Sequence, residues 1–145
     1  MLVTLARRHV PVYVRGGKCF IDADDCAIGN ILAMERGRPG RRYLLGNWNH
    51  SYREFMRMCA EVAGRRGPWL PAPNLALRAA GRLAPILQRV DAHRFAGLDR
   101  SVLSAMQQAR YRTGRRSWEE LGVPRTPLPV TVEKAYRWFR ENGYC

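Results

Sequence analysis

Ser117-Trp118-Glu119-Glu120-Leu121-Gly122-Val123-Pro124 is the stretch that decides how this 145-residue sequence is interpreted. Residues 115–121 are typical of a short helix, and Gly122 supplies the left-handed residue that commonly ends one. After a proline-rich spacer, apolar residues recur at helical spacing through residues 130–141, and Asn142-Gly143 ends the pattern. The stretch and its surroundings therefore predict a short helix, an extended connection and a final amphipathic helix.

The upstream sequence predicts short strands and further helices. A helix is expected after Asp24 or Asp25, because either carboxylate can cap its first turn. Its apolar positions recur at helical spacing: Ile28, Ile31, Leu32 and Met34. Ser51-x-x-Glu54 fits the reciprocal capping box at the start of another helix, which runs to Gly64.

The remaining segments give weaker patterns. A helix is expected at residues 2–8, and short extended pieces at residues 10–14, 19–21, 42–46 and 110–113. Residues 47–50 are polar and predict a turn. Residues 75–90 predict an apolar helix that Pro85 kinks or divides, followed by a loop and a helix near residues 101–109.

Length and composition fit one folded unit over residues 1–145. Hydrophobic residues make up 46% of the chain and charged residues 26%, as in globular proteins. The 13 glycines and 9 prolines divide the chain into short elements. We expect a helix-rich α+β fold with a few short strands.

The charge favours a different class of function. The formal net charge is +13, and Lys18 and Lys134 are the only lysines, so nearly every cation is an arginine. A positive surface attracts nucleic acid or phosphorylated ligands. The arginines are dispersed in pairs rather than gathered in a tract, which makes nucleic acid the weaker expectation. The alternative function is a stand-alone basic module that binds a phosphorylated ligand or nucleic acid.

Several other classes are excluded or not encoded. The four cysteines form no Cys-x-x-Cys pair and the three histidines stand apart, so we expect no metal site. No apolar run reaches the length of a membrane span. The apolar residues 1–6 are too few for a secretory signal, and we expect a cytoplasmic location.

Four motifs occur in order along the chain. They are Phe20-Ile21-Asp22-Ala23-Asp24-Asp25-Cys26-Ala27, Gly37-Arg38-Pro39-Gly40-Arg41-Arg42-Tyr43-Leu44-Leu45-Gly46, Arg115-Arg116-Ser117-Trp118-Glu119-Glu120-Leu121-Gly122 and Trp138-Phe139-Arg140-Glu141-Asn142-Gly143-Tyr144. The ordered set resembles the C-terminal, substrate-binding part of extended short-chain dehydrogenase/reductases, which include NAD-dependent epimerase/dehydratases and dihydroflavonol-reductase-like enzymes. The resemblance covers essentially the whole chain. It implies the C-terminal lobe of an NAD(P)-binding Rossmann-type α/β enzyme.

The resemblance also implies roles for particular residues. Lys18, Arg110 and Arg112 lie nearest the basic positions that contact the substrate diphosphate in family members acting on nucleotide sugars. A guanidinium there can hold phosphate oxygens in a bidentate fork. Asp22 and Asp25 fall on the family's two acidic positions, for which helix capping is the expected role. Ser51 is expected to cap the helix that it begins.

The family's cofactor and catalytic motifs do not occur in this sequence. There is no Gly-x-x-Gly-x-x-Gly turn to approach a pyrophosphate. Tyr111 and Tyr136 are followed four residues later by Arg115 and Arg140, where the family's catalytic pair has lysine. We therefore expect the substrate-binding lobe of an NAD(P)-dependent sugar epimerase/dehydratase or carbonyl reductase, with no catalytic or cofactor-binding residue of its own and inactive alone. Its expected partners are a small-molecule substrate and a complementing Rossmann domain or a second copy of itself.

Overall fold

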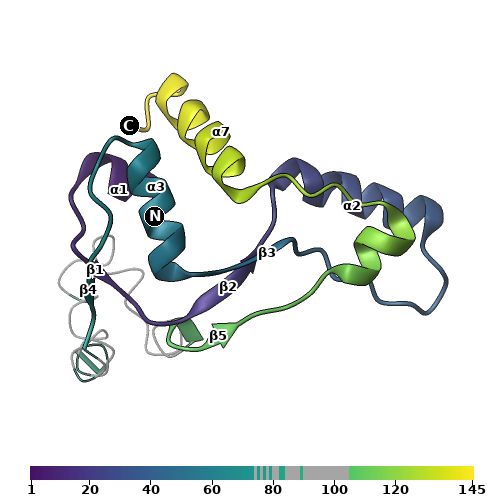
Figure 1. The fold of residues 1–145 in the computed structure, drawn as a ribbon, viewed down its shortest axis with the longest axis horizontal. Coiled ribbons are helices and arrows are strands. Elements are labelled where there is room, and N and C mark those ends of the chain that lie inside the picture. Colours follow the sequence, from purple (N-terminus) through teal and green to yellow (C-terminus); the bar gives the residue numbers. More distant parts are fainter. Residues whose placement is uncertain (74, 76, 78, 80–81, 84–88, 90–104) are drawn as a thin grey trace.

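A three-stranded sheet lies at the centre of the fold. The computed structural model describes residues 1–73, 75, 77, 79, 82–83, 89 and 105–145. Strand β2 (Gly17–Phe20) pairs antiparallel with β3 (Trp48–Ser51) and parallel with β5 (Ala109–Arg110) (Figure 1). A separate parallel pair joins β1 (Val12–Tyr13) to β4 (Leu70–Pro71).

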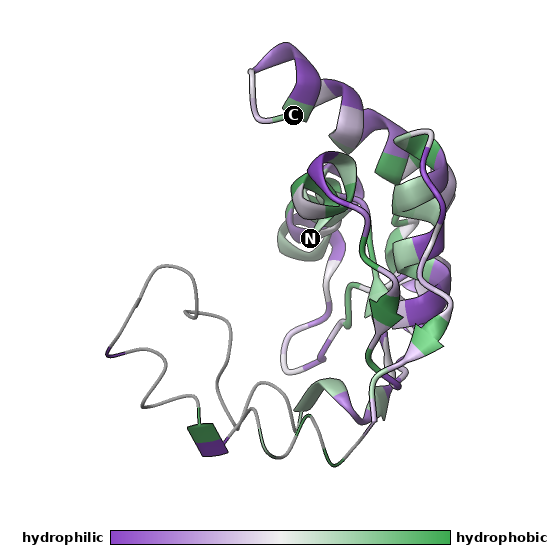
Figure 2. Ribbon diagram, turned by 90° about the vertical axis from the view of Figure 1, so that its left-hand side faces the viewer, coloured by the Kyte–Doolittle hydropathy of each residue, from purple (hydrophilic) through white to green (hydrophobic). Residues whose placement is uncertain are grey.

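Three helices pack together beside the sheet and form the main core. They are α1 (Leu2–Arg7), α3 (Tyr52–Val62) and α7 (Leu128–Glu141). Hydrophobic and hydrophilic positions alternate along the described helices (Figure 2), as expected where one face of each helix is buried. The buried residues of this core are Leu2, Leu5, Met56, Cys59, Leu128 and Val132. Burial raises the pKa of the Cys59 thiol to about 11, which keeps that sulfur protonated.

Helix α2 (Ala23–Arg36) and the π-helical turn η1 (Ser117–Leu121) pack against each other at the end of the molecule away from α3 (Figure 1). Gly122 ends η1 with a φ of 74°, a left-handed conformation that favours glycine. The Ser117 hydroxyl donates to the Leu44 carbonyl at 2.8 Å, which ties η1 to the segment after α2.

The structure confirms the helix-rich α+β fold with a few short strands. The expected helices at residues 2–8, from Ser51 and at residues 130–141 are present, and the last begins two residues early. The helix expected after Asp24 or Asp25 is also present, but it begins earlier, at Ala23, with Asp22 as its N-cap. Those expected at residues 75–90 and 101–109 lie largely outside the described residues, as does the loop between them.

Two details of the prediction are wrong. Residues 42–46, an expected strand, pair with no strand in the part of the chain that the structure describes, whereas the expected turn at residues 47–50 lies largely within β3. The polar side chains of β3 misled the prediction, because strand pairing uses backbone groups that every residue has. In α2, Ile28, Ile31 and Met34 are exposed rather than buried. The apolar spacing identified the helix but not the face that packs.

Replacing Leu5 tests the main core. Leu5 is 2% exposed in the contact between α1, α3 and α7, so Leu5→Ala leaves a cavity and should lower the free energy of unfolding by about 2–5 kcal/mol. Leu70→Ala is the control, because Leu70 is 44% exposed and its loss should cost about 0.5 kcal/mol or less. Urea denaturation measures both, and equal costs would contradict the packing described.

Candidate functional site

The central sheet brings two of the expected substrate-binding residues together. Lys18 on β2 is the register partner of Arg110 on β5, and on its other side it pairs with His50 on β3. Register partners present their side chains on the same face of a sheet. Lys18, Arg110 and His50 therefore form a row across three strands, here called the basic row. Lys18 and Arg110 form no ion pair with a carboxylate among the described residues.

His50 ends the basic row beside a carboxylate. Its Nδ1 lies 3.6 Å from Glu54 Oε2, and the same carboxylate accepts hydrogen bonds from the N–H and hydroxyl of Ser51. The hydrogen bonds from Ser51, with a smaller effect of His50, lower the pKa of Glu54. The negative charge of Glu54 is thus fixed at one end of the row, and Lys18 and Arg110 leave the other end positive.

Arg112 lies two residues beyond Arg110, outside β5, and its backbone is held in place. The Asn49 side chain accepts from the Arg112 N–H at 3.0 Å and donates to the Arg112 carbonyl at 2.8 Å. The Arg112 guanidinium donates to the Tyr111 carbonyl. A Cβ at Gly17 would lie 2.6 Å from the Tyr111 side chain, so only glycine leaves room for that ring over β2. The structure thus fixes the path of residues 110–112 beside the basic row.

Two of the three expected capping residues occupy helix N-caps. Asp22 precedes α2 and accepts from the Asp24 N–H at 2.9 Å. Ser51 precedes α3, where its hydroxyl and the Glu54 side chain form both halves of a capping box. Both contacts satisfy backbone donors that a helix terminus leaves without a partner.

The prediction that Asp25 caps a helix is wrong, because its carboxylate does not cap α2. It lies in the first turn, where it is 3% exposed and accepts from the Thr126 N–H at 2.7 Å and the Thr126 hydroxyl at 2.8 Å. A third bond, at 3.0 Å, comes from the Asn47 amide. Asn47 in turn bonds the Pro124 carbonyl and the Trp118 indole N–H. The carboxylate therefore joins segments that are far apart in the sequence.

The same region holds a stacked cation that the sequence did not predict. The guanidinium carbon of Arg125 lies 3.8 Å from the ring centroid of Trp118 and 4.7 Å from that of Trp48. Such contacts attract the cation to the faces of the rings. The Trp48 indole N–H also donates to the Thr126 carbonyl at 2.8 Å. Arg125 is thereby engaged in holding residues 124–126 against β3, which argues against a role for it in ligand binding.

Lys134 connects α7 to the start of α2. Its ammonium lies 3.3 Å from Asp22 Oδ1 and also contacts the Asp24 carboxylate. The hydrogen bond that the Lys134 ammonium donates to Asp24 and, with a smaller effect, the one that it donates to Asp22 raise the pKa of Lys134. Burial raises the pKa of Asp22, but the hydrogen bonds from the Asp24 N–H, Thr131 and Lys134 outweigh it and leave that pKa below its ordinary value.

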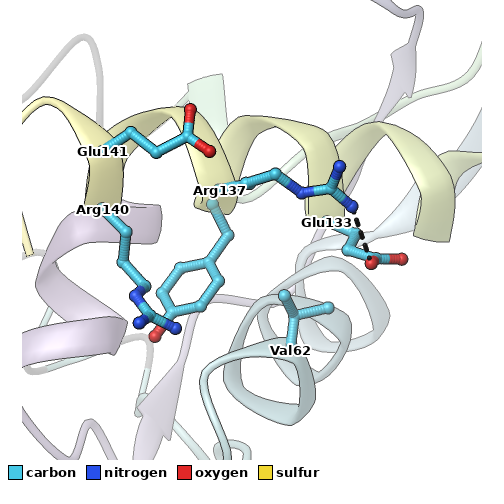
Figure 3. A pocket seen from close by; sticks show the side chains of 6 residues that line it. Val62, Glu133, Arg137, Arg140 and Glu141 are labelled. Carbon is cyan, nitrogen blue, oxygen red and sulfur yellow. Dashed lines mark hydrogen bonds and ion pairs between the residues drawn. The ribbon is translucent and has the colours of Figure 1, made fainter.

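The described residues include no glycine turn of the kind that holds a dinucleotide pyrophosphate. The spacings Gly37-x-x-Gly40 and Gly64-x-x-Gly67 follow the ends of α2 and α3, whereas a pyrophosphate site needs a glycine turn between a strand and the start of a helix. The cleft between α3 and α7 has a volume of about 510 Å³, but Arg137 and Glu133 on its wall bond each other at 3.3 Å (Figure 3). Over the part of the chain that the structure describes, no three His, Cys, Asp or Glu side chains gather as a metal site would require, and no helix could cross a membrane.

Similarity to known proteins covers nearly all of the chain. No protein-family model matches it. A putative dihydroflavonol 4-reductase of Synechocystis is 29% identical over 154 residues, which cover 99% of this chain and 43% of that protein. The sterol demethylase protein B of Methylococcus capsulatus is 24% identical, over 98% of this chain and 44% of its own length.

Two crystal structures agree with this. That of gox2253 aligns with a TM-score of 0.76 and 28% identity, over 99% of this chain and 43% of its own. A nucleoside-diphosphate-sugar epimerase from Pseudomonas aeruginosa aligns with a TM-score of 0.71 and 32% identity, over 99% and 42%. Over nearly its whole length the chain is similar to a C-terminal-like fragment of dihydroflavonol-reductase and nucleoside-diphosphate-sugar-epimerase proteins. The family resemblance predicted from the sequence is confirmed, and the chain spans less than half the length of these relatives.

Removal of the Asp25 carboxylate should destabilise the chain strongly. Asp25→Ala leaves the Thr126 N–H and hydroxyl and the Asn47 amide without their acceptor, so the free energy of unfolding should fall by about 3 kcal/mol. Glu61→Ala removes an exposed carboxylate from an ion pair on α3 and should cost about 0.5 kcal/mol or less. Chemical denaturation at neutral pH compares the two variants, and a cost for Asp25→Ala as small as for Glu61→Ala would contradict the network.

Asp22 should make stability fall in acid. Its folded pKa lies below the ordinary value of 3.8, so the folded state binds fewer protons than the unfolded chain. The stabilisation is then fully present above the unfolded pKa and is lost as the pH falls through the lower folded pKa. Unfolding followed from pH 6 to pH 2 should show a shallower acid loss in Asp22→Asn than in the parent, whereas Glu61→Gln should keep the parent slope. An unchanged slope in Asp22→Asn would exclude this linkage.

Proposed function

We propose that this chain is the substrate-binding portion of an NAD(P)-dependent reductase or sugar epimerase, and that the basic row binds an anionic group of the substrate. The observation that carries the proposal is the register pairing of Lys18 with Arg110. The two cations lie side by side, at strand spacing, on the sheet that leads into α2. A phosphate can bridge two cations at that separation, the guanidinium by a bidentate fork and the ammonium as a point charge.

A nucleoside diphosphate is the substrate group that this arrangement fits best. The Pseudomonas aeruginosa relative is described as a nucleoside-diphosphate-sugar epimerase, so a diphosphate belongs to the ligand class that its name gives. In this chain Arg112 follows Arg110 beside the basic row and adds a third cation, whose backbone Asn49 holds in place. At the other end of the row His50 contacts the negatively charged Glu54. This carboxylate repels an anionic ligand and so directs it toward Lys18 and Arg110.

Hydride or proton transfer is assigned to a part of the enzyme that has no counterpart in this chain. Neither Tyr111 nor Tyr136 is followed at the catalytic spacing by lysine, and Gly37-x-x-Gly40 and Gly64-x-x-Gly67 each follow a helix rather than precede one. NAD or NADP would therefore be held elsewhere, and this chain would supply the binding and orientation of the substrate. Correct orientation alone contributes substantially to rate enhancement.

Binding of uridine diphosphate tests the proposal directly. Charge-assisted hydrogen bonds contribute about 1.5–3 kcal/mol, so Lys18→Ala and Arg110→Ala should each raise the dissociation constant roughly 10- to 100-fold in isothermal titration calorimetry. Arg57→Ala is the matched control, because it removes one positive charge from α3, outside the sheet. An equal loss in all three variants would indicate attraction to the overall charge, and no binding by the parent chain would refute the proposal.

A further inference from the structure

Two segments of the chain carry positive charge without any carboxylate. Residues 1–21 and 62–90 contain none of the 12 acidic residues, whereas four lysines and arginines lie in the first segment and five arginines in the second. An uneven distribution of this kind gives one part of a surface a positive potential. Where the fold brings the two segments together, the potentials of their cations add.

The parallel pair of β1 and β4 brings these two segments together. Val12 is the register partner of Leu70, and the Trp69 and Leu70 N–H groups both donate to the Pro11 carbonyl, at 3.0 and 2.9 Å. Parallel strands run in the same direction, so the residues that precede them lie at the same end of the pair. Figure 1 shows the chain from α1 and the chain from α3 both leading to this pair.

Four arginines lie at the shared end. Arg7 and Arg8 precede the first residue of β1 by five and four residues, and Arg65 and Arg66 precede the first residue of β4 by the same numbers. All four are exposed, and none forms an ion pair with a carboxylate among the described residues. The carboxylate nearest in sequence, Glu61, is paired with an arginine of α3. The four side chains are here called the arginine patch.

Exposed apolar side chains adjoin the arginine patch. Val12 and Leu70 are register partners, so their side chains lie on the same face of the pair, and both are exposed. The next register partners, Tyr13 and Pro71, are half-buried on the other face, where Tyr13 packs against the core. Trp69, next to Leu70, is 65% exposed. The open face of the pair is therefore apolar at the end that carries the arginines.

We propose that the arginine patch, together with Val12, Trp69 and Leu70, binds the surface of a membrane that contains anionic lipids, without crossing it. Charge complementarity selects an anionic surface, because guanidinium groups pair with headgroup phosphates. The apolar side chains select lipid over nucleic acid. Val12 and Leu70 have no ring on which a base can stack, whereas a lipid surface buries aliphatic side chains and favours tryptophan at its boundary.

The proposed membrane contact is independent of the basic row. The arginine patch precedes the β1–β4 pair, whereas Lys18 and Arg110 lie on the three-stranded sheet. An isolated anion needs two or three convergent cations, but a membrane surface presents many phosphates in a plane. Arginines spread over two segments, with apolar side chains between the strands that follow them, match a plane of phosphates over an apolar layer.

Vesicle binding tests the inference on the whole chain. Sedimentation with vesicles of phosphatidylcholine, alone or with about one third phosphatidylglycerol, should show binding to the anionic vesicles only, and salt should weaken it. Arg65→Gln combined with Arg66→Gln should lower the partition coefficient about 10- to 30-fold. Arg41→Gln combined with Arg42→Gln is the matched control, because it removes the same charge from another exposed pair of arginines and should bind nearly as the parent does.

The apolar residues give an independent measurement. Tryptophan fluorescence should shift to shorter wavelength when vesicles bind, and Trp69→Phe should remove the shift although the other three tryptophans remain. Leu70→Ser should lower the partition coefficient about 3- to 10-fold, because less apolar area enters the lipid. Val130→Ser is its control, because Val130 is 51% exposed on α7 and should bind as the parent does. Circular dichroism checks that each variant folds.

The contrary outcomes are specific. No binding to anionic vesicles, or a fluorescence shift that persists in Trp69→Phe, would exclude this surface. An equal loss in both double arginine variants would indicate attraction to the overall charge and overturn the inference. Single-stranded DNA bound in place of vesicles, and released in the Arg65→Gln, Arg66→Gln variant, would assign the patch to nucleic acid. Uridine diphosphate takes no part in these measurements, so its failure to bind the basic row would leave the membrane contact standing.

Discussion

The arrangement of α2, β3 and the segment before α7 depends on the hydrogen bonds that the Asp25 carboxylate accepts. Thr126 is 101 residues away in the sequence, yet both its backbone N–H and its hydroxyl donate to this one group. Because the carboxylate is buried, the folded state would be strongly destabilised without the three hydrogen bonds that it accepts. Through Asn47 the same network reaches Trp118 and Pro124, so one carboxylate aligns α2, β3 and the approach to α7.

Local rules predicted the parts of this fold that are decided locally. The capping box at Ser51 and Glu54, the left-handed Gly122 and the amphipathic pattern of α7 each depend on residues within one turn of one another. The Asp25 network depends on a partner that only the tertiary fold supplies, so the sequence suggested the nearer role of a helix cap. The pairing of Lys18 with Arg110 also depends on the tertiary fold, because the sequence of neither strand alone determines the register between β2 and β5.

The errors at residues 42–51 have a common cause. Residues 43–45 are apolar or aromatic but pair with no strand among the described residues, whereas β3 is polar and pairs with β2 along its length. The composition of a segment indicates its propensity for a strand, but the tertiary structure determines whether it pairs with another strand. The exposed apolar face of α2 has the same cause, because an apolar stripe on a helix is buried only where another element packs on it.

The close contact between Gly17 and Tyr111 restricts how this sequence can change. A side chain at position 17 would meet the ring on one side and the His50 carbonyl, 2.7 Å away, on the other. The ring could be made smaller, but the carbonyl belongs to the paired strand and cannot withdraw. A substitution of Gly17 is therefore unfavourable even when position 111 changes to a smaller residue. During sequence divergence we expect Gly17 to be retained more strictly than Tyr111.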